Sequence, residues 1–153
     1  MKIADVLKKE SVIPYLRSKT KAEVIRELSE HVSSVSNNIN TERLVEVLME
    51  RERLCSTAVD SGVAIPHGKL SGISNIITAF GRSIEGVDFE SLDGNPTHLF
   101  ILLLAPENSV GTHLKLLARF SKIFKSPEFR SKLMQAKSQD EIYELIIEED
   151  AKH

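Results

Sequence analysis

The sequence predicts a single-domain α/β layered sandwich, in which a central mixed β-sheet is flanked by helices. Two observations carry this prediction: segments with helical periodicity occupy both ends of the chain, and short apolar, strand-like segments fill the middle. The length of 153 residues suits one domain with a substantial core. We expect that domain to span residues 1–148 and a short charged tail, 149–153, to fray.

The first elements are expected to be short. A helix over 5–9 precedes a strand over 12–16, which Pro14 interrupts because proline lacks the backbone N–H that a strand partner needs.

Two longer helices follow. Thr20-x-x-Glu23 matches a capping box, in which two side chains satisfy free N–H groups at a helix start, so a helix is expected from Thr20 to about residue 35. His31 lies on the apolar stripe of this helix and is predicted to be packed rather than active. A turn over 37–40 leads to a second helix over 42–54.

The middle of the chain reads as strands, and the last third as helices. The expected strands cover 63–66, 76–83, 87–89 and 97–104. The expected helices cover 110–125, 127–135 and 139–147. Ser126 followed by Pro127 is a typical helix start, and Ser138-x-x-Glu141 predicts a second capping box.

Composition excludes several classes of protein. The formal net charge is −2, so no basic surface favours nucleic acid. A single cysteine, Cys55, excludes an intramolecular disulfide framework and suits a reducing compartment. The N-terminus is too charged for a signal peptide, and no run approaches the ~20 apolar residues of a membrane helix. We therefore expect a cytoplasmic protein with no fused membrane portion.

The segment 61–69 contains the first candidate functional residue. Val63, Ala64 and Ile65 read as a buried strand that Pro66 ends, and His67 follows. Strand ends often carry function in α/β proteins, and a histidine there can act as a nucleophile or proton carrier. The structural alternative is a histidine that ends a strand and hydrogen-bonds to a carbonyl.

A second histidine occupies a comparable position. His113 follows the strand expected over 97–104 and lies in the first turn of the next helix, where side chains are exposed and the local field favours anions. If the two strands are neighbours in one sheet, His67 and His113 point at the same place. An ordinary surface histidine at a helix start is the alternative.

Arg51 lies in a charged cluster just before the loop that leads to the His67 strand. Such a cluster is most often a solvated helix end, but an arginine here could reach a doubly charged phosphoryl group. Arg53 is close enough to be an alternative. Other motifs fail: segment 62–70 lacks the Ser/Thr of a P-loop, and a zinc site would need a third ligand, for which His98 is the candidate. No metal is expected.

These residues carry a resemblance to a known family. The chain resembles the enzyme IIA domains of the bacterial phosphoenolpyruvate:sugar phosphotransferase system, of the fructose/mannitol/nitrogen-regulatory type. The matching strings are Arg51-Glu52, Ser56-Thr57, Gly62-Val-Ala-Ile-Pro-His-Gly-Lys-Leu70 and Thr112-His113-Leu114. The spacing of the histidines, 113 − 67 = 46, also fits, and the resemblance runs from about Lys2 to about Ile147.

The resemblance implies phosphotransferase chemistry without a cofactor. His67 would accept a phosphoryl group from phospho-HPr, on Nε2, and pass it to a cysteine of an enzyme IIB domain during sugar uptake. His113 would stabilise the phosphoryl group, and Arg51 its charge. Ser56, Thr57 and Gly68 would contribute substrate contacts.

The resemblance leaves a second function open. IIA proteins of the nitrogen-regulatory branch act as switches, and the phosphorylation state of His67 would then control binding to regulatory protein partners. Phosphorylation adds about −1.5 to −2 charge, which changes an exposed surface strongly.

Overall fold

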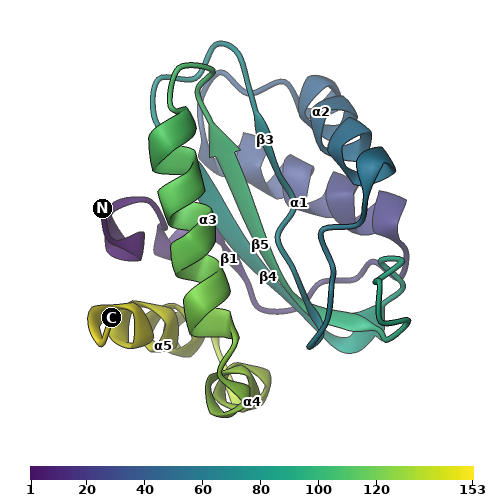
Figure 1. Cartoon of the computed structure of the whole chain (residues 1–153), viewed down its shortest axis with the longest axis vertical. Helices are drawn as coiled ribbons and strands as arrows, with labels where there is room; N and C mark the ends of the chain where they lie inside the picture. The colour runs from purple at the N-terminus through teal and green to yellow at the C-terminus, as the bar shows by residue number, and fades with distance from the viewer.

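The computed structural model describes residues 1–153, and its core is a mixed sheet (Figure 1). The strands are β1 (Val12–Ile13), β2 (Val63–Ala64), β3 (His67–Lys69), β4 (Ile77–Val87) and β5 (Thr97–Ala105). The sheet order is β1-β4-β5-β2, with β3 also paired to β5. Only β4 and β5 are antiparallel; the other pairs are parallel. The predicted mixed sheet is thus confirmed.

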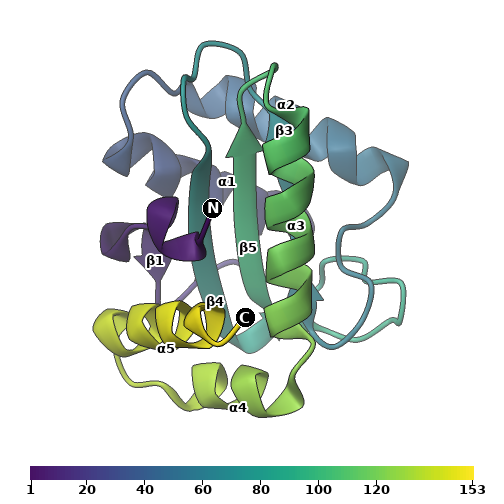
Figure 2. The ribbon, with the colours of Figure 1, turned by 60° about the vertical axis from the view of Figure 1, so that its left-hand side comes forward.

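Helices cover both faces of this sheet (Figure 2). The 3-10 turns η1 (Ile3–Asp5) and η2 (Lys9–Ser11) precede five α-helices. These are α1 (Lys21–Val35), α2 (Thr41–Leu54), α3 (Val110–Phe124), α4 (Pro127–Gln135) and α5 (Gln139–Ala151). Helices α1 and α2 pack on one face, and α3, α4 and α5 on the other.

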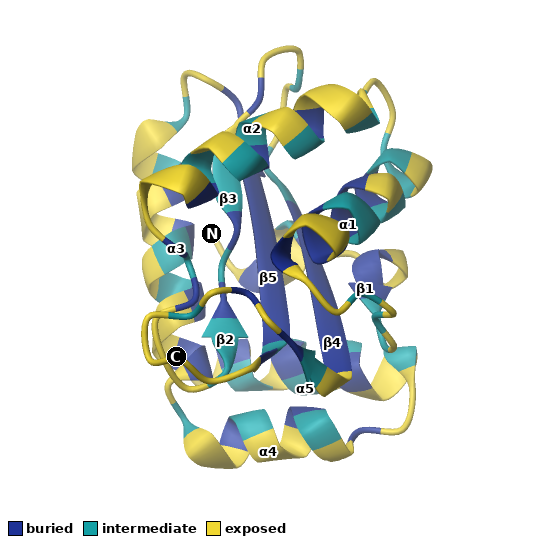
Figure 3. Ribbon diagram, turned by 90° about the vertical axis from the view of Figure 1, so that its right-hand side faces the viewer, coloured by how far each residue is buried: buried dark blue, intermediate teal, exposed yellow.

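The central strand β5 explains how the layers hold together. Phe100, Leu102 and Leu104 belong to the core beneath α1 and α2. Leu99 and Ile101 alternate with them and belong to the core beneath α3, α4 and α5. A strand buried on both faces has this continuous apolar run, and both β4 and β5 are mainly buried (Figure 3).

Several predicted boundaries are confirmed at the caps. Thr20 accepts from the Glu23 N–H and Glu23 accepts from the Thr20 N–H, as a capping box requires. Ser126 caps α4, with Pro127 at its first position. Ser138 caps α5, but Glu141 accepts from the Lys137 N–H rather than closing the second predicted box.

Other boundaries differ from the predictions at the N-terminus and in the sheet. The expected helix over 5–9 is replaced by η1 and η2, and the first strand ends at Ile13, because Pro14 cannot donate to the ladder. The strand expected over 87–89 is not separate, since β4 continues to Val87 through an irregularity after Arg82.

The C-terminal helix is longer than predicted. Helix α5 continues to Ala151 instead of ending at 147, so most of the expected tail is helical. Asp150 is buried and accepts hydrogen bonds from the Ile3 N–H and from Arg119, which fixes the last turn against the N-terminus. No helix of the chain combines the length and hydrophobicity that a bilayer span requires.

Candidate functional site

The two candidate histidines meet at one surface cavity of about 660 Å³, formed by α2, β3 and the start of α3. Strand β3 pairs with β5 in parallel, and α3 follows β5, so His67 and His113 reach the same end of the sheet. Their ring centroids lie 5.4 Å apart, and the rings are nearly perpendicular, at 89°. The geometry expected for two neighbouring strands is therefore present.

His67 begins β3 instead of following the end of a strand. Pro66 interrupts the edge strand but does not terminate it, because its carbonyl still accepts from the Leu103 N–H at 3.0 Å and the pairing with β5 resumes at His67. The expectation that Pro66 ends the strand is corrected accordingly.

The ring of His67 is fixed through one nitrogen. Nδ1 lies 2.8 Å from the Ile65 carbonyl oxygen. A carbonyl only accepts, so Nδ1 carries the hydrogen and Nε2 keeps its lone pair. Burial lowers the pKa of His67, the Ile65 hydrogen bond opposes this, and Arg51 lowers it further. The site thus favours a neutral imidazole with Nε2 available.

His113 is buried, although a first-turn position predicted exposure. It is 6% exposed, and its Nε2 makes no hydrogen bond within the protein. Burial lowers its pKa, with His67 and Lys69 adding to the decrease. A buried nitrogen without a partner is uncommon, so His113 Nε2 is a candidate for binding a ligand.

The structure separates the two candidate arginines. Arg51 lines the cavity and donates from Nη1 to the Cys55 carbonyl at 2.9 Å, which anchors its guanidinium near the end of α2. Arg53 is exposed and does not line the cavity. Of the two, only Arg51 is placed beside His67.

Gly68 allows α2 to approach β3 closely. A Cβ at this position would lie 2.8 Å from Val47 Cγ1, well inside normal contact. Arg51 is one helical turn beyond Val47, so the absence of a side chain at Gly68 sets how near Arg51 comes to His67. Gly68 also lines the cavity.

Ser56 and Thr57 are not among the residues that line this cavity. The Ser56 hydroxyl donates to the Phe89 carbonyl at 3.1 Å, and the Thr57 hydroxyl donates to Glu52 at 2.6 Å. Each hydroxyl has a single hydrogen, so neither has a free donor for a substrate. The predicted substrate contacts from these two hydroxyls find no support in the geometry.

Sequence reasoning missed several residues around the histidines. Lys69 lines the cavity, although the sequence indicates it only as part of the matching string around His67. Leu54, Val110 and Leu114 are 82%, 46% and 61% exposed and form an apolar rim. Leu114 is exposed although it lies in a helix with a largely apolar stripe. The position of Leu114 directly after His113 is the sequence signal that points to this rim.

Two of the other three histidines bind backbone carbonyls away from this cavity. His31 is half-buried, and its Nε2 lies 2.6 Å from the Glu10 carbonyl oxygen. His98 Nδ1 lies 2.9 Å from the Ser83 carbonyl oxygen, near the start of β5, whereas His67 pairs with Leu103 near the end of that strand. No three His, Cys, Asp or Glu side chains are grouped as a metal site would need.

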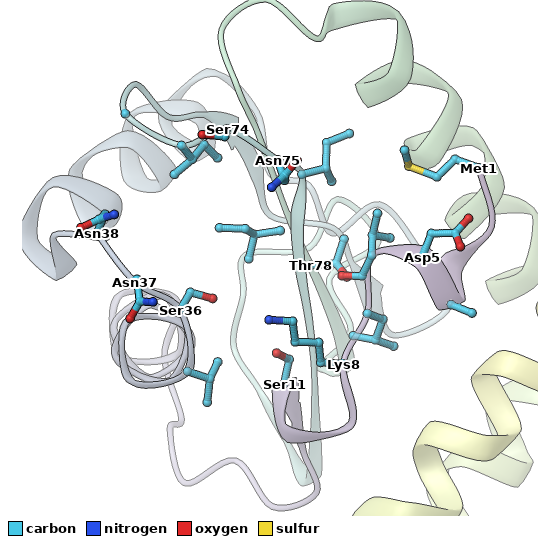
Figure 4. A pocket seen from close by; sticks show the side chains of 18 residues that line it. Met1, Asp5, Lys8, Ser11, Ser36, Asn37, Asn38, Ser74, Asn75 and Thr78 are labelled. Carbon is cyan, nitrogen blue, oxygen red and sulfur yellow. The ribbon is translucent and has the colours of Figure 1, made fainter.

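A second large cavity, of about 540 Å³, contains none of the predicted site residues. The N-terminal turns, the end of α1 and the segment entering β4 form it, and its labelled lining includes Lys8, Ser11, Ser36 and Asn75 (Figure 4). This cavity therefore offers no support for the predicted chemistry.

Comparison with known proteins finds relatives that match nearly the whole chain. The family model for the phosphoenolpyruvate-dependent sugar phosphotransferase system, EIIA 2, matches residues 5–149. A nitrogen regulatory protein of Bradyrhizobium diazoefficiens is 38% identical over 146 residues, which is 95% of each chain. The fructose-specific EIIABC component of Bacillus subtilis is 37% identical over 150 residues, 98% of this chain. The chain spans only 24% of that larger protein.

Solved structures share the fold. The nitrogen regulatory protein IIA-Ntr of Neisseria meningitidis aligns with a TM-score of 0.88 and 31% identity, over 94% of this chain and 98% of its own. A second solved structure is mannitol IIA of Escherichia coli in complex with phosphorylated IIB. It aligns with a TM-score of 0.72 over 92% of this chain and 96% of its own. At 22% identity, this likeness shows the fold alone. With the family model matching nearly the whole chain, this protein belongs to the EIIA 2 family of the phosphoenolpyruvate-dependent sugar phosphotransferase system.

Proposed function

We propose that this protein is a phosphocarrier that accepts a phosphoryl group from phospho-HPr on His67 and passes it to a cysteine of an enzyme IIB partner in sugar uptake. One observation carries the proposal. His67 is anchored through Nδ1, which leaves a neutral Nε2 in a cavity that also holds Arg51 and the unpaired Nε2 of His113.

The reaction needs little beyond positioning and charge stabilisation. The Nε2 lone pair attacks phosphorus, and the bond to the donor atom breaks with its electron pair staying on the donor. Arg51 and Lys69 offset the negative charge on the phosphoryl oxygens. His113 donates a hydrogen bond to one oxygen in the tautomer that carries hydrogen on Nε2.

The surroundings of the cavity suit protein partners. Leu54, Val110 and Leu114 place exposed apolar side chains around the histidines, and apolar rims of this kind mark protein–protein contact sites. A donor and an acceptor protein would dock there in turn. Mannitol IIA, which shares this fold, is known in complex with phosphorylated IIB, and this supports a IIB partner here.

The second candidate function is a regulatory switch, favoured by the near full-length match to nitrogen regulatory proteins. In this version, phosphorylation of His67 adds about −1.5 to −2 charge within the apolar rim. Regulatory proteins would then bind one state and not the other. Both functions require phosphorylation of His67 and differ in the partner that reads it.

Phosphorylation with phosphoenolpyruvate, enzyme I and HPr, followed by intact mass, tests both. We expect one acid-labile phosphoryl group on the wild type and none on His67→Ala. Arg51→Ala should slow phosphorylation strongly, whereas Arg53→Ala, the matched control, should change it little. No added mass with active donors would overturn the proposal. Transfer to IIB then supports sugar uptake, and its absence together with phosphorylation-dependent partner binding supports the switch.

A further inference from the structure

Glu52 is a buried carboxylate that the proposed mechanism does not use. It is 5% exposed and lies next to Arg51 in α2. Its Oε1 accepts from the Thr57 N–H at 3.1 Å and lies 3.2 Å from Lys21 Nζ, while Oε2 accepts from the Thr57 hydroxyl at 2.6 Å. These contacts hold the carboxylate at a fixed position.

The packing of α2 places this charge near His67. The nearest side-chain atoms to a Cβ at Gly68 belong to Val47 and Leu48. One helical turn further along α2 come Arg51 and Glu52, so two opposite charges occupy adjacent helix positions beside the strand that carries His67. Arg51 opens into the cavity, whereas Glu52 lies on the buried side with Leu48.

The two charges act on the imidazole in opposite directions. Burial is the main cause that lowers the pKa of His67; Arg51 adds to this decrease and Glu52 opposes it. Water screens a buried charge poorly, so its effect reaches further than that of a surface carboxylate. Lys21, at the start of α1, offsets part of the Glu52 charge.

We infer that Glu52 raises the free energy of the phosphorylated state at His67 and so keeps the phosphoryl group transferable. The inference rests on the proposed function. In the transfer, one bond from phosphorus to the donor breaks and one to Nε2 forms, so the relative stability of the two phosphorylated proteins decides the equilibrium. Arg51 stabilises the phosphoryl anion, and the buried Glu52 charge counteracts it.

The transfer equilibrium tests this role. Purified phospho-HPr, freed of enzyme I, is mixed with each variant in known ratio, and intact mass gives the phosphorylated fractions. We expect Glu52→Gln to shift the equilibrium about tenfold toward the phosphorylated protein, because a dianion loses a buried neighbouring charge. Lys21→Met should shift it the other way.

A double variant and a matched control guard against misfolding. The double variant Lys21→Met/Glu52→Gln removes both buried charges and so leaves no uncompensated lysine. Its transfer equilibrium should still lie further toward the phosphorylated protein than that of the wild type. The exposed pair Arg43–Glu46 lies on the same helix. Its counterpart variant, Arg43→Met/Glu46→Gln, should change the equilibrium less than about twofold because water screens it.

A second readout separates this inference from the proposed function. Titration of His67 by NMR in the unphosphorylated protein should give a lower pKa in Glu52→Gln than in the wild type. An unchanged His67 pKa in Glu52→Gln would overturn the role of Glu52. So would a transfer equilibrium that the buried-pair and exposed-pair double variants change equally. A lowered pKa in a protein that never accepts a phosphoryl group would instead overturn the proposed function, and the transfer role with it.

Discussion

Substituting Gly68 by alanine should disrupt the site through packing alone. The new Cβ would lie 2.8 Å from Val47 Cγ1. Carbon atoms in contact prefer about 3.5–4.0 Å, so roughly 1 Å of movement is required. Val47 is β-branched and its side chain is stiff in a helix, so α2 itself must move. Overpacking of this kind costs about 1–3 kcal/mol.

The shift of α2 should reduce activity more than stability. A 1 Å misplacement of a positioning group costs on the order of 100-fold in rate, and Arg51 lies one turn beyond Val47. The initial rate of phosphorylation by phospho-HPr, measured by intact mass, should fall by about that factor. The melting temperature should fall by about 2–4 °C for each kcal/mol.

Two variants make the explanation refutable. Val47→Ala/Gly68→Ala removes the overlapping methyl groups and should restore most of the rate. Gly111→Ala is the matched control, since a Cβ there meets nothing within 4 Å, and it should leave folding intact. If Gly68→Ala behaves like the wild type, or the double variant recovers nothing, the close approach of α2 does not set the position of Arg51.

Further predictions concern pH and two buried ion contacts. Burial lowers the pKa of both His67 and His113, so their neutral forms persist below pH ~6.5. The phosphorylation rate should therefore reach its plateau by neutral pH. The folding stability that the two histidines contribute should be present above pH ~6.5 and lost as the pH falls through their lowered pKa values. Asp150→Asn should lower the free energy of unfolding, measured in urea, by about 2–3 kcal/mol, since it weakens two hydrogen bonds of a buried carboxylate. The control Asp140→Asn, at an exposed carboxylate, should change that free energy by less than about 0.5 kcal/mol. Arg82→Met should cost at least about 3 kcal/mol in the same assay, because buried carbonyls at the end of α4 and at Pro14 lose their donor; equal stability would contradict this account.

Local sequence signals predicted the elements that local chemistry controls. Thr20 and Ser126 begin helices because their side chains satisfy neighbouring N–H groups, and such bonds involve residues three positions away. The apolar run of β5 likewise announces a strand buried on both faces. The extent of α5 was missed because Asp150 depends on Ile3, far away in sequence.

The sequence by itself determined the candidate histidines, the fold class and the family, because the motif around His67 and its spacing to His113 are contained in the order of residues. Only the tertiary structure decided that Arg51 rather than Arg53 faces the cavity, and that the Ser56 and Thr57 hydroxyls are already engaged. Packing of α2 against β3 orients these side chains, and the order of residues does not state which face of α2 meets β3. The same packing buries Glu52 beside Arg51 and gives two adjacent, opposite charges different effects on one imidazole.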